Sequence, residues 1–216
     1  MRMEIKKSMK EKVKLAILVS IILINTLILS GCWNYREIND LLIVSGVAID
    51  KNENNDGYIL TIETICPKGG ETVEMLPSVH TAEGKTVFDA IRNSIQLSGR
   101  KIYWSHAKAI IVSEEIAKEG IVPILDFFNR SIEVRSDIWI LVSLGKTAKE
   151  ILYGKDTIHN TLSYHIEEMI ESEKSIPKFH GVELYEFLND LSAKGLSPIA
   201  PTTEMKATKD MIIPKI

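Results

Sequence analysis

The most continuous apolar stretch lies near the N-terminus, where residues 15–29 read LAILVSIILINTLIL after a basic segment. Residues 1–14 carry six lysine and arginine side chains against two glutamates. A charged start, an apolar run of this length and small residues after it are typical of a secretory signal peptide. The run is shorter than the roughly 20 apolar residues that cross a bilayer. We therefore predict that residues 1–31 are a signal peptide.

The next pattern predicts two strands joined by a tight turn. Residues 41–49 (LLIVSGVAI) are mostly apolar, which is typical of a central strand. Residues 50–57 are polar, and residues 58–65 then alternate between apolar and polar positions, so the pair predicts an antiparallel hairpin. Residues 66–83 contain two prolines and two glycines and are predicted to form an irregular loop.

Helix signals begin at residue 86. Thr86 with Asp89 forms a capping-box pattern for a helix that Gly99 ends, and Thr147 with Glu150 forms a second such pattern. The other predicted elements are a strand at 106–112, a short helix from Ser113 to Gly120, a helix with Pro123 in its first turn, a strand at 137–143, and helices at 158–170 and 182–191, the last closed by Gly195.

Strands separated by helices of this length predict an α/β to α+β domain, a mixed β-sheet with packed helices, over residues 41–195. Residues 106–143 are the best candidate for a right-handed βαβ crossover. Residues 32–40 are interpreted as a membrane-proximal linker. Residues 196–216 contain three prolines and are interpreted as a linker or the start of a missing C-terminal domain. We expect residues 40–195 to fold alone.

Charge and composition narrow the function classes. Removal of residues 1–31 leaves 185 of the 216 residues and changes the net charge from −3 to about −7. A chain this acidic is not expected to bind nucleic acid or to act as a peripheral polybasic protein. Hydrophobic residues make up 45% of the sequence and charged residues 25%, which predicts a globular domain rather than a disordered one.

The two cysteines have different predicted roles. Leu29-Ser30-Gly31-Cys32 fits the bacterial lipobox at every required position, so we expect cleavage between Gly31 and Cys32 and acyl chains on Cys32. Two or three acyl chains hold a protein firmly, because each buried CH₂ contributes about 0.8 kcal/mol. The alternative is an uncleaved signal anchor in which Cys32 is an ordinary thiol. Cys66 is interpreted as a buried or half-buried inert thiol.

Motifs for catalysis are missing from the sequence. Two Gly-Lys-Thr tripeptides, at 84–86 and 145–147, lack the upstream glycine of a phosphate-binding loop, because Val79 and Ile140 stand there. The five histidines are scattered without the spacing of a metal site, and there is no Gly-x-Ser-x-Gly elbow. We therefore expect a protein that is not an enzyme and that holds no metal or cofactor.

Three segments together resemble a known family. Residues 31–40 (GCWNYREIND) contain the lipobox cysteine and precede an apolar strand that ends in Ile-Asp. Residues 100–108 (RKIYWSHAK) form a basic–aromatic–His segment before a predicted strand, and residues 125–135 (LDFFNRSIEVR) contain Leu-Asp, Arg and Glu-x-Arg. In this order, the motifs resemble the Ger(x)C, or GerAC-like, spore germination lipoproteins over essentially the whole mature chain.

The resemblance implies a function that composition does not give. It implies the C subunit of a nutrient germinant receptor, lipid-anchored on the outer face of the spore inner membrane or cell membrane. Such subunits act with A and B subunits, both integral membrane proteins, and no catalytic activity is attributed to them. Family members continue into a comparably large C-terminal region, so the resemblance implies an N-terminal domain. The rival interpretation is a lipid-anchored solute-binding protein of a membrane transporter, although such proteins are usually larger, with two similar lobes.

The resembling segments also give candidate interface residues. These are Trp33, Arg36, Glu37, Tyr103, His106, Arg130 and Arg135. Each has a simpler interpretation as well. Trp33 would lie at the lipid headgroups, and Arg36 and Glu37 would be solvated linker charges. Arg130, Glu133 and Arg135 would form a surface ion-pair cluster worth little, and His106 would be a satisfied structural histidine.

Overall fold

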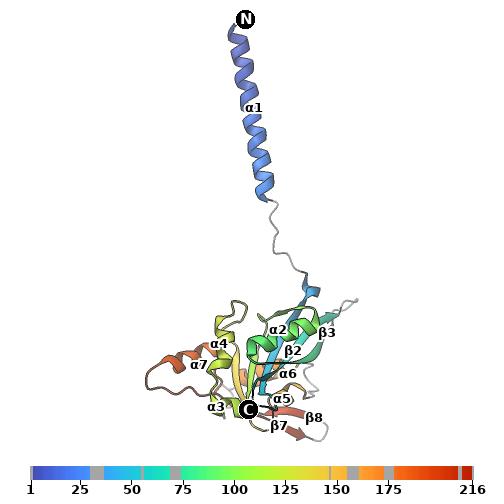
Figure 1. Cartoon of the computed structure of the whole chain (residues 1–216), viewed down its shortest axis with the longest axis vertical. Helices are drawn as coiled ribbons and strands as arrows, with labels where there is room; N and C mark the ends of the chain where they lie inside the picture. Colours follow the sequence, from blue (N-terminus) through green and yellow to red (C-terminus); the bar gives the residue numbers. More distant parts are fainter. Residues whose placement is uncertain are drawn as a thin grey trace. The chain divides into compact units, whose positions relative to one another are not determined.

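A computed structural model describes residues 2–29, 37–54, 56–68, 74–145, 147–154, 161–172, 178–208 and 211–215. The chain divides into two compact units, Met1–Ile38 and Asn39–Ile216. The first unit contains helix α1 (Arg2–Leu29), blue in Figure 1. Among the described residues, no helix combines the length and apolarity needed to cross a membrane. The expectations for Gly31, Cys32, Trp33 and Arg36 lie outside the described residues.

The second unit is built on a mixed sheet in the strand order β3-β2-β1-β5-β6-β7-β8, with β4 also paired to β1. Three antiparallel strands form one side, β1 (Leu41–Lys51), β2 (Tyr58–Lys68) and β3 (Glu74–Gly84). Parallel strands continue the sheet from β1, namely β4 (Lys101–Tyr103), β5 (Ala109–Ser113), β6 (Trp139–Ser143) and β7 (Thr202–Thr208). Strand β8 (Met211–Lys215) pairs antiparallel with β7.

Helices cover both faces of this sheet. One apolar core joins the sheet to α2 (Val87–Ser98), α3 (Glu114–Glu119), α4 (Val122–Arg130) and α7 (Leu184–Ser192). A second core joins the opposite face to α5 (Lys149–Leu152) and α6 (Leu162–Glu171), and a short 3₁₀ turn, η1 (Ile38–Asp40), precedes β1. The mixed sheet with packed helices confirms the predicted fold class. Every member of both cores lies between Val44 and Met205.

The predicted loop at residues 66–83 is wrong, because β2 runs to Lys68 and β3 begins at Glu74. Strand β3 is at the edge of the sheet, where a proline such as Pro77 is tolerated because one side of the strand needs no ladder hydrogen bonds. Pro67 lies beyond Ile65, the last β2 residue paired with β1, so β2 has only one neighbour there. The sequence pattern gave no sign of this difference between edge and centre.

The predicted crossover at residues 106–143 is confirmed in that β5 and β6 pair in parallel. Helices α3 and α4 lie between these strands in the chain. The predicted strand at 106–112 begins later, at Ala109, and His106 lies in a turn before it. Strand β4 was not predicted, because three residues are too few to show a period. The sheet also continues past residue 195 through β7, whose Thr203 is fully buried (Figure 1).

Local helix caps on the first face follow the prediction. The Thr86 hydroxyl accepts the Asp89 N–H at 3.1 Å, and Gly99 ends α2 in a left-handed conformation with φ 68°. The Ser113 hydroxyl likewise accepts the Ile116 N–H at 3.4 Å at the start of α3. The predicted capping box at Thr147 is wrong. Ala148 occupies the N-cap of α5, and the buried Thr147 hydroxyl has no hydrogen-bond partner within the described part of the chain.

Candidate interaction surface

The two family-like segments, residues 100–108 and 125–135, meet in space. Strand β4 pairs in parallel with the first residues of β1, so Lys101 lies opposite Leu41. The Lys101 ammonium forms an ion pair with the Glu133 carboxylate. The Ser105 hydroxyl donates to the Glu133 carbonyl at 3.0 Å. The loop after α4 is therefore fastened to the segment that follows α2.

Aromatic packing makes the second connection between these segments. Trp104 is 3% exposed, and its ring lies edge-on to Phe127 and Phe128 with centroid distances of 5.7 and 5.6 Å. Such edge-to-face pairs add about 0.5–1.5 kcal/mol to the burial of apolar area. Trp104 and Phe128 therefore serve the core and are not available for contacts outside the domain.

Tyr103 and His106 lie on the surface of this junction. Tyr103 is half-buried and His106 is exposed, with 6.1 Å between the ring centroids. The two interpretations of His106, as an interface residue and as a satisfied structural histidine, both stay predictions. Glu37, the remaining candidate in the described residues, is also exposed.

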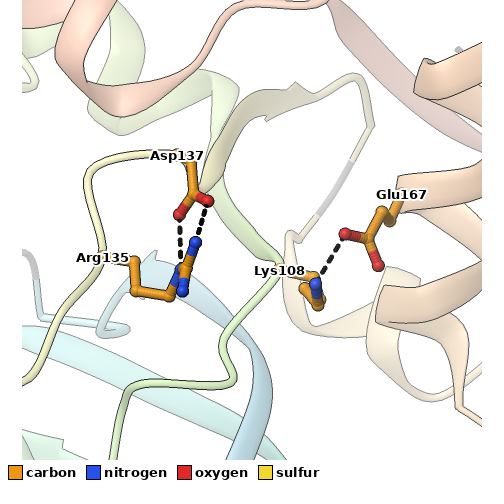
Figure 2. A network of polar contacts seen from close by, with 4 residues as sticks. All are labelled: Lys108, Arg135, Asp137 and Glu167. Atoms are coloured by element: carbon orange, nitrogen blue, oxygen red, sulfur yellow. Dashed lines mark hydrogen bonds and ion pairs between the residues drawn. The ribbon is translucent and has the colours of Figure 1, made fainter.

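The candidate arginines each pair with a near neighbour in the sequence. Arg130 donates to Asp126 at 2.7 Å along α4. Arg135 makes a two-pronged contact with Asp137 at 2.8 and 2.5 Å, and Figure 2 shows the two side chains facing each other. Hydrogen bonding to the Arg135 guanidinium lowers the pKa of Asp137. Arg130, Glu133 and Arg135 each take part in an ion pair, as the simpler interpretation expects, but their partners are Asp126, Lys101 and Asp137.

Lys108 is the last residue of the first family-like segment and immediately precedes β5. It connects this strand to α6, on the face of the sheet that α5 and α6 cover. Its ammonium lies 2.7 Å from the Glu167 carboxylate on α6 (Figure 2). Its backbone N–H donates to the Ser45 carbonyl at 2.7 Å. Both ends of the residue are engaged, which makes Lys108 a positioning residue within the fold.

We use the name basic surface for residues 97–106 and 130–135. These residues carry Arg100, Lys101, Arg130 and Arg135 against a single acidic residue, Glu133, a net charge of +3. The surface also carries two strongly exposed aliphatic side chains, Leu97 at 77% and Ile132 at 102%. Sequence reasoning missed these two residues, although an isoleucine between Ser131 and Glu133 after a helix end is a visible signal.

The opposite end of the sheet has the opposite charge. Residues 50–57, which follow β1, and residues 114–119, which follow β5, together have a net charge of −4. Lys51 and Glu119 join these two segments through an ion pair at 2.6 Å. Because β1, β4 and β5 are parallel, the basic surface lies at the end where β1 begins and this acidic end lies where β1 finishes.

Two buried carboxylates were also missed by sequence reasoning. Asp50, at the end of β1, accepts the N–H groups of Ala148 and Lys149 at 2.5 and 2.9 Å at the start of α5. Burial raises the pKa of Asp50, and the two N–H groups oppose that rise. Glu63 on β2 accepts the N–H groups of Leu162 and Ser163 at 2.7 and 3.0 Å at the start of α6.

Between α2 and α4 lies an apolar groove of about 770 Å³. It is lined by Thr86, Val87, Phe88, Val122, Pro123, Asp126, Phe127, Arg130 and Ser131. Within the described ranges, no three histidine, cysteine, aspartate or glutamate side chains are grouped so that they could hold a metal ion. Cys66 is a half-buried free thiol, as predicted.

Comparison with known proteins identifies the class of protein. Residues 34–205 match the family described as the spore germination protein N-terminal domain, so the chain belongs to this family. Spore germination protein KC of Bacillus subtilis (strain 168) is 27% identical over 199 residues, which cover 88% of this chain and 49% of that protein. The B. subtilis spore germination protein YfkR is 31% identical over 191 residues, 85% of this chain and 48% of its own length.

Spore germination protein B3 of the same organism is 26% identical over 139 residues, which cover 62% of this chain and 37% of that protein. The chain thus spans about half the length, or less, of the curated relatives it matches. No solved structure matches it. The family match extends from the linker before β1 into β7, and so includes both cores and the basic surface.

Proposed function

We propose that this chain is a lipid-anchored, non-enzymatic subunit of a nutrient germinant receptor that supports spore germination in response to nutrients. The observation that carries the proposal is the match of residues 34–205 to the spore germination family. Relatives named as spore germination proteins cover up to 88% of the chain, so the similarity is not confined to a short motif.

The membrane attachment that we propose starts at Cys32. The lipobox at residues 29–32 supports cleavage after Gly31 and acylation of Cys32. Trp33 would then lie at the level of the lipid headgroups, and residues 33–40 would tether the domain to the outer face of the spore inner membrane. Two or three acyl chains give the stable attachment that one chain does not.

The proposed protein partners are the integral-membrane A and B subunits of the receptor. Tyr103, His106, Arg130 and Arg135 are the proposed contact residues, together with Glu37 in the linker. Their support is positional, since β4 lies beside the first residues of β1 and the tether enters the domain there. An anchor at Cys32 would hold this end of the domain nearest to the membrane in which such partners would lie.

The rival function is solute binding for a transporter. A solute-binding protein usually has two similar lobes with a cleft between them, whereas the match of residues 34–205 to the spore germination family supports a receptor subunit. The sequence also lacks the nucleophile and metal motifs of a lipoprotein hydrolase. These observations favour the receptor subunit over both other classes.

Gene deletion with single-nutrient germination assays tests the proposal. We expect spores without this gene to germinate poorly with at least one nutrient and to recover when the wild-type gene is restored. Nutrient-independent germination, for example by a chemical that bypasses receptors, serves as the control and should not change. Normal germination with every nutrient, together with reduced uptake of one solute, would overturn the proposal in favour of the transporter function.

A further inference from the structure

We propose that the basic surface is a membrane-contacting face, on which Leu97 and Ile132 enter the headgroup region of an anionic bilayer. Arg100 and Lys101 would lie among the lipid phosphates around them, and Tyr103, His106, Arg130 and Arg135 would remain for the receptor subunits in the same membrane. This inference rests on the proposed anchoring of the chain at Cys32, and it adds a defined orientation of the domain over the bilayer.

The first argument is the position of the tether. Strand β1 begins nine residues after Cys32, and nine residues span at most about 32 Å when fully extended. Residues 41–43 of β1 pair with residues 101–103 of β4, inside the basic surface. The acidic end lies a further length of β1 away, about 35 Å for eleven residues. The basic surface is therefore the end of the domain that the tether holds nearest to the bilayer.

The second argument is the exposure of two aliphatic side chains at this end. Ile132 is 102% exposed and Leu97 is 77% exposed, the two highest values among the exposed large hydrophobic residues of the described chain. Both lie within four residues of the ion pair between Lys101 and Glu133. Neither lines the apolar groove between α2 and α4. Separate protruding aliphatic side chains with arginine and lysine nearby suit insertion into a lipid interface.

The third argument is charge. The basic surface has a net charge of +3, which falls to +1 when Asp126 and Asp137, the ion-pair partners of Arg130 and Arg135, are included, and the acidic end has a net charge of −4. A field of this polarity orients the domain with its basic surface toward anionic lipids and its acidic end away from them. The attraction acts only within a Debye length of about 8 Å at physiological salt. Only a domain held close by a short tether would use it.

The exposed residues at the two ends of α4 provide a matched test. Ile132 follows the C-terminus of α4 in the basic surface, and Val122, 54% exposed, is the first residue of the same helix, next to the acidic end. Three variants of the full-length Cys66→Ser protein would each carry one new cysteine, through Ile132→Cys, Leu97→Cys or Val122→Cys. A fluorescent thiol label would report contact with nitroxide-labelled lipids in vesicles of phosphatidylcholine with phosphatidylglycerol as the minor lipid.

The nine residues of α4 span about 13.5 Å and lie between positions 122 and 132, so we expect quenching to be about twofold or more stronger at positions 132 and 97 than at position 122. Removal of phosphatidylglycerol should reduce that difference. Equal quenching at all three positions would overturn the proposal and would point to a domain that stands off the bilayer. Circular dichroism of each variant confirms that the fold is kept.

Intact-mass measurement on the same samples separates this proposal from the proposed anchoring. If Cys32 carries acyl chains but position 132 is not quenched, the membrane-contacting face is wrong and the anchoring stands. If residues 1–31 are retained, Cys32 is a second labelled thiol, so the comparison is repeated in a Cys32→Ser, Cys66→Ser background. Stronger quenching at position 132 than at position 122 there would mean that the anchoring is wrong and the face stands.

Discussion

The two faces of the sheet differ in how their helices begin. On the face covered by α2 and α3, each helix is capped by a side chain immediately before it, Thr86 or Ser113. On the opposite face, α5 and α6 are capped by Asp50 and Glu63, which come from strands about 100 residues earlier in the chain. A helix N-terminus leaves four N–H groups without partners inside the helix, and both solutions satisfy some of them.

This difference has a consequence for stability. A local cap connects a helix only to its own first turn, so its loss affects that helix. A buried carboxylate from a strand connects helix formation to sheet formation and is costly to remove, because the donors it leaves are buried. Glu63 is 2% exposed, and the Leu162 and Ser163 N–H groups depend on its side chain, whereas the Ser45 hydroxyl donates both to the carboxylate at 2.8 Å and to the Glu63 carbonyl at 3.1 Å. The second face should therefore form only when the strands are in place.

The largest expected effect is on Glu63. Glu63→Ala leaves the buried Leu162 and Ser163 N–H groups without their acceptor, and we expect a loss of about 4 kcal/mol in the free energy of unfolding. The Ser45 hydroxyl loses the carboxylate but keeps the Glu63 carbonyl at 3.1 Å. Glu63→Gln keeps one acceptor oxygen and should lose about half as much. Urea unfolding followed by circular dichroism measures both. A loss below about 1 kcal/mol for the alanine variant would show that the buried carboxylate stabilises its helix no more than a local side-chain cap does.

The next effect concerns the close approach of α6 to β1. A β-carbon on Gly46 would lie 1.9 Å from the Ser163 hydroxyl oxygen and 2.8 Å from its β-carbon. We expect Gly46→Ala to cost about 2 kcal/mol, because overpacking forces the helix and the strand apart. Combining Gly46→Ala with Ser163→Gly should recover part of the loss in a double-mutant cycle. Strict additivity of the two changes would contradict the contact.

Asp50 gives a pH-dependent effect. We expect Asp50→Asn to cost about 1.5 kcal/mol at neutral pH, because the amide accepts only one of the two N–H groups. The pKa of Asp50 is raised above its usual 3.8, so the folded protein takes up a proton before the unfolded chain does. The Asp50 contribution therefore grows as the pH falls from neutral toward 3.8. The free energy of unfolding, measured across this range, should show the difference between wild type and Asp50→Asn increasing as the pH falls. A difference that decreases would contradict the raised pKa.

The smallest effects compare two threonines that share a sequence pattern. Thr86→Ala removes a working cap and should cost about 1 kcal/mol. Thr147→Ala removes a buried hydroxyl that makes no hydrogen bond among the described residues, so we expect a change of less than about 0.5 kcal/mol. Thermal unfolding of the two variants is sufficient to measure this. Equal losses of stability in the two variants would indicate that Thr147 caps α5, as its sequence pattern predicts.

The sequence predicted the elements whose signals are local. The β1–β2 hairpin, the α2 helix with Thr86 and Gly99, and the parallel pair β5–β6 follow from periodicity and capping patterns within a few residues. Strand β3 could not be predicted, because prolines count against a strand unless its position at the sheet edge is known. Asp50 and Glu63 could not be assigned as caps, because their partners are set by the folded sheet and not by spacing.

The same limit applies to the basic surface. The segments at 100–108 and 125–135 were identified one by one, and two of their candidate residues, Tyr103 and His106, do form a surface ring contact. The ion pair between Lys101 and Glu133 joins the two segments, and it depends on the pairing of β4 with β1, which no sequence pattern indicated. Leu97 and Ile132 became candidates only through their exposure in the folded domain.

The proposed receptor function and the proposed orientation of the domain both begin at Cys32, so its chemistry is the most direct test of the account. Intact-mass analysis of the protein extracted from membranes should show that residues 1–31 are absent and that the mature chain carries a diacylglycerol with or without a further acyl chain. The Cys32→Ala variant should accumulate as the unprocessed precursor. A wild-type protein that retains residues 1–31 and has an unmodified Cys32 thiol would contradict the account.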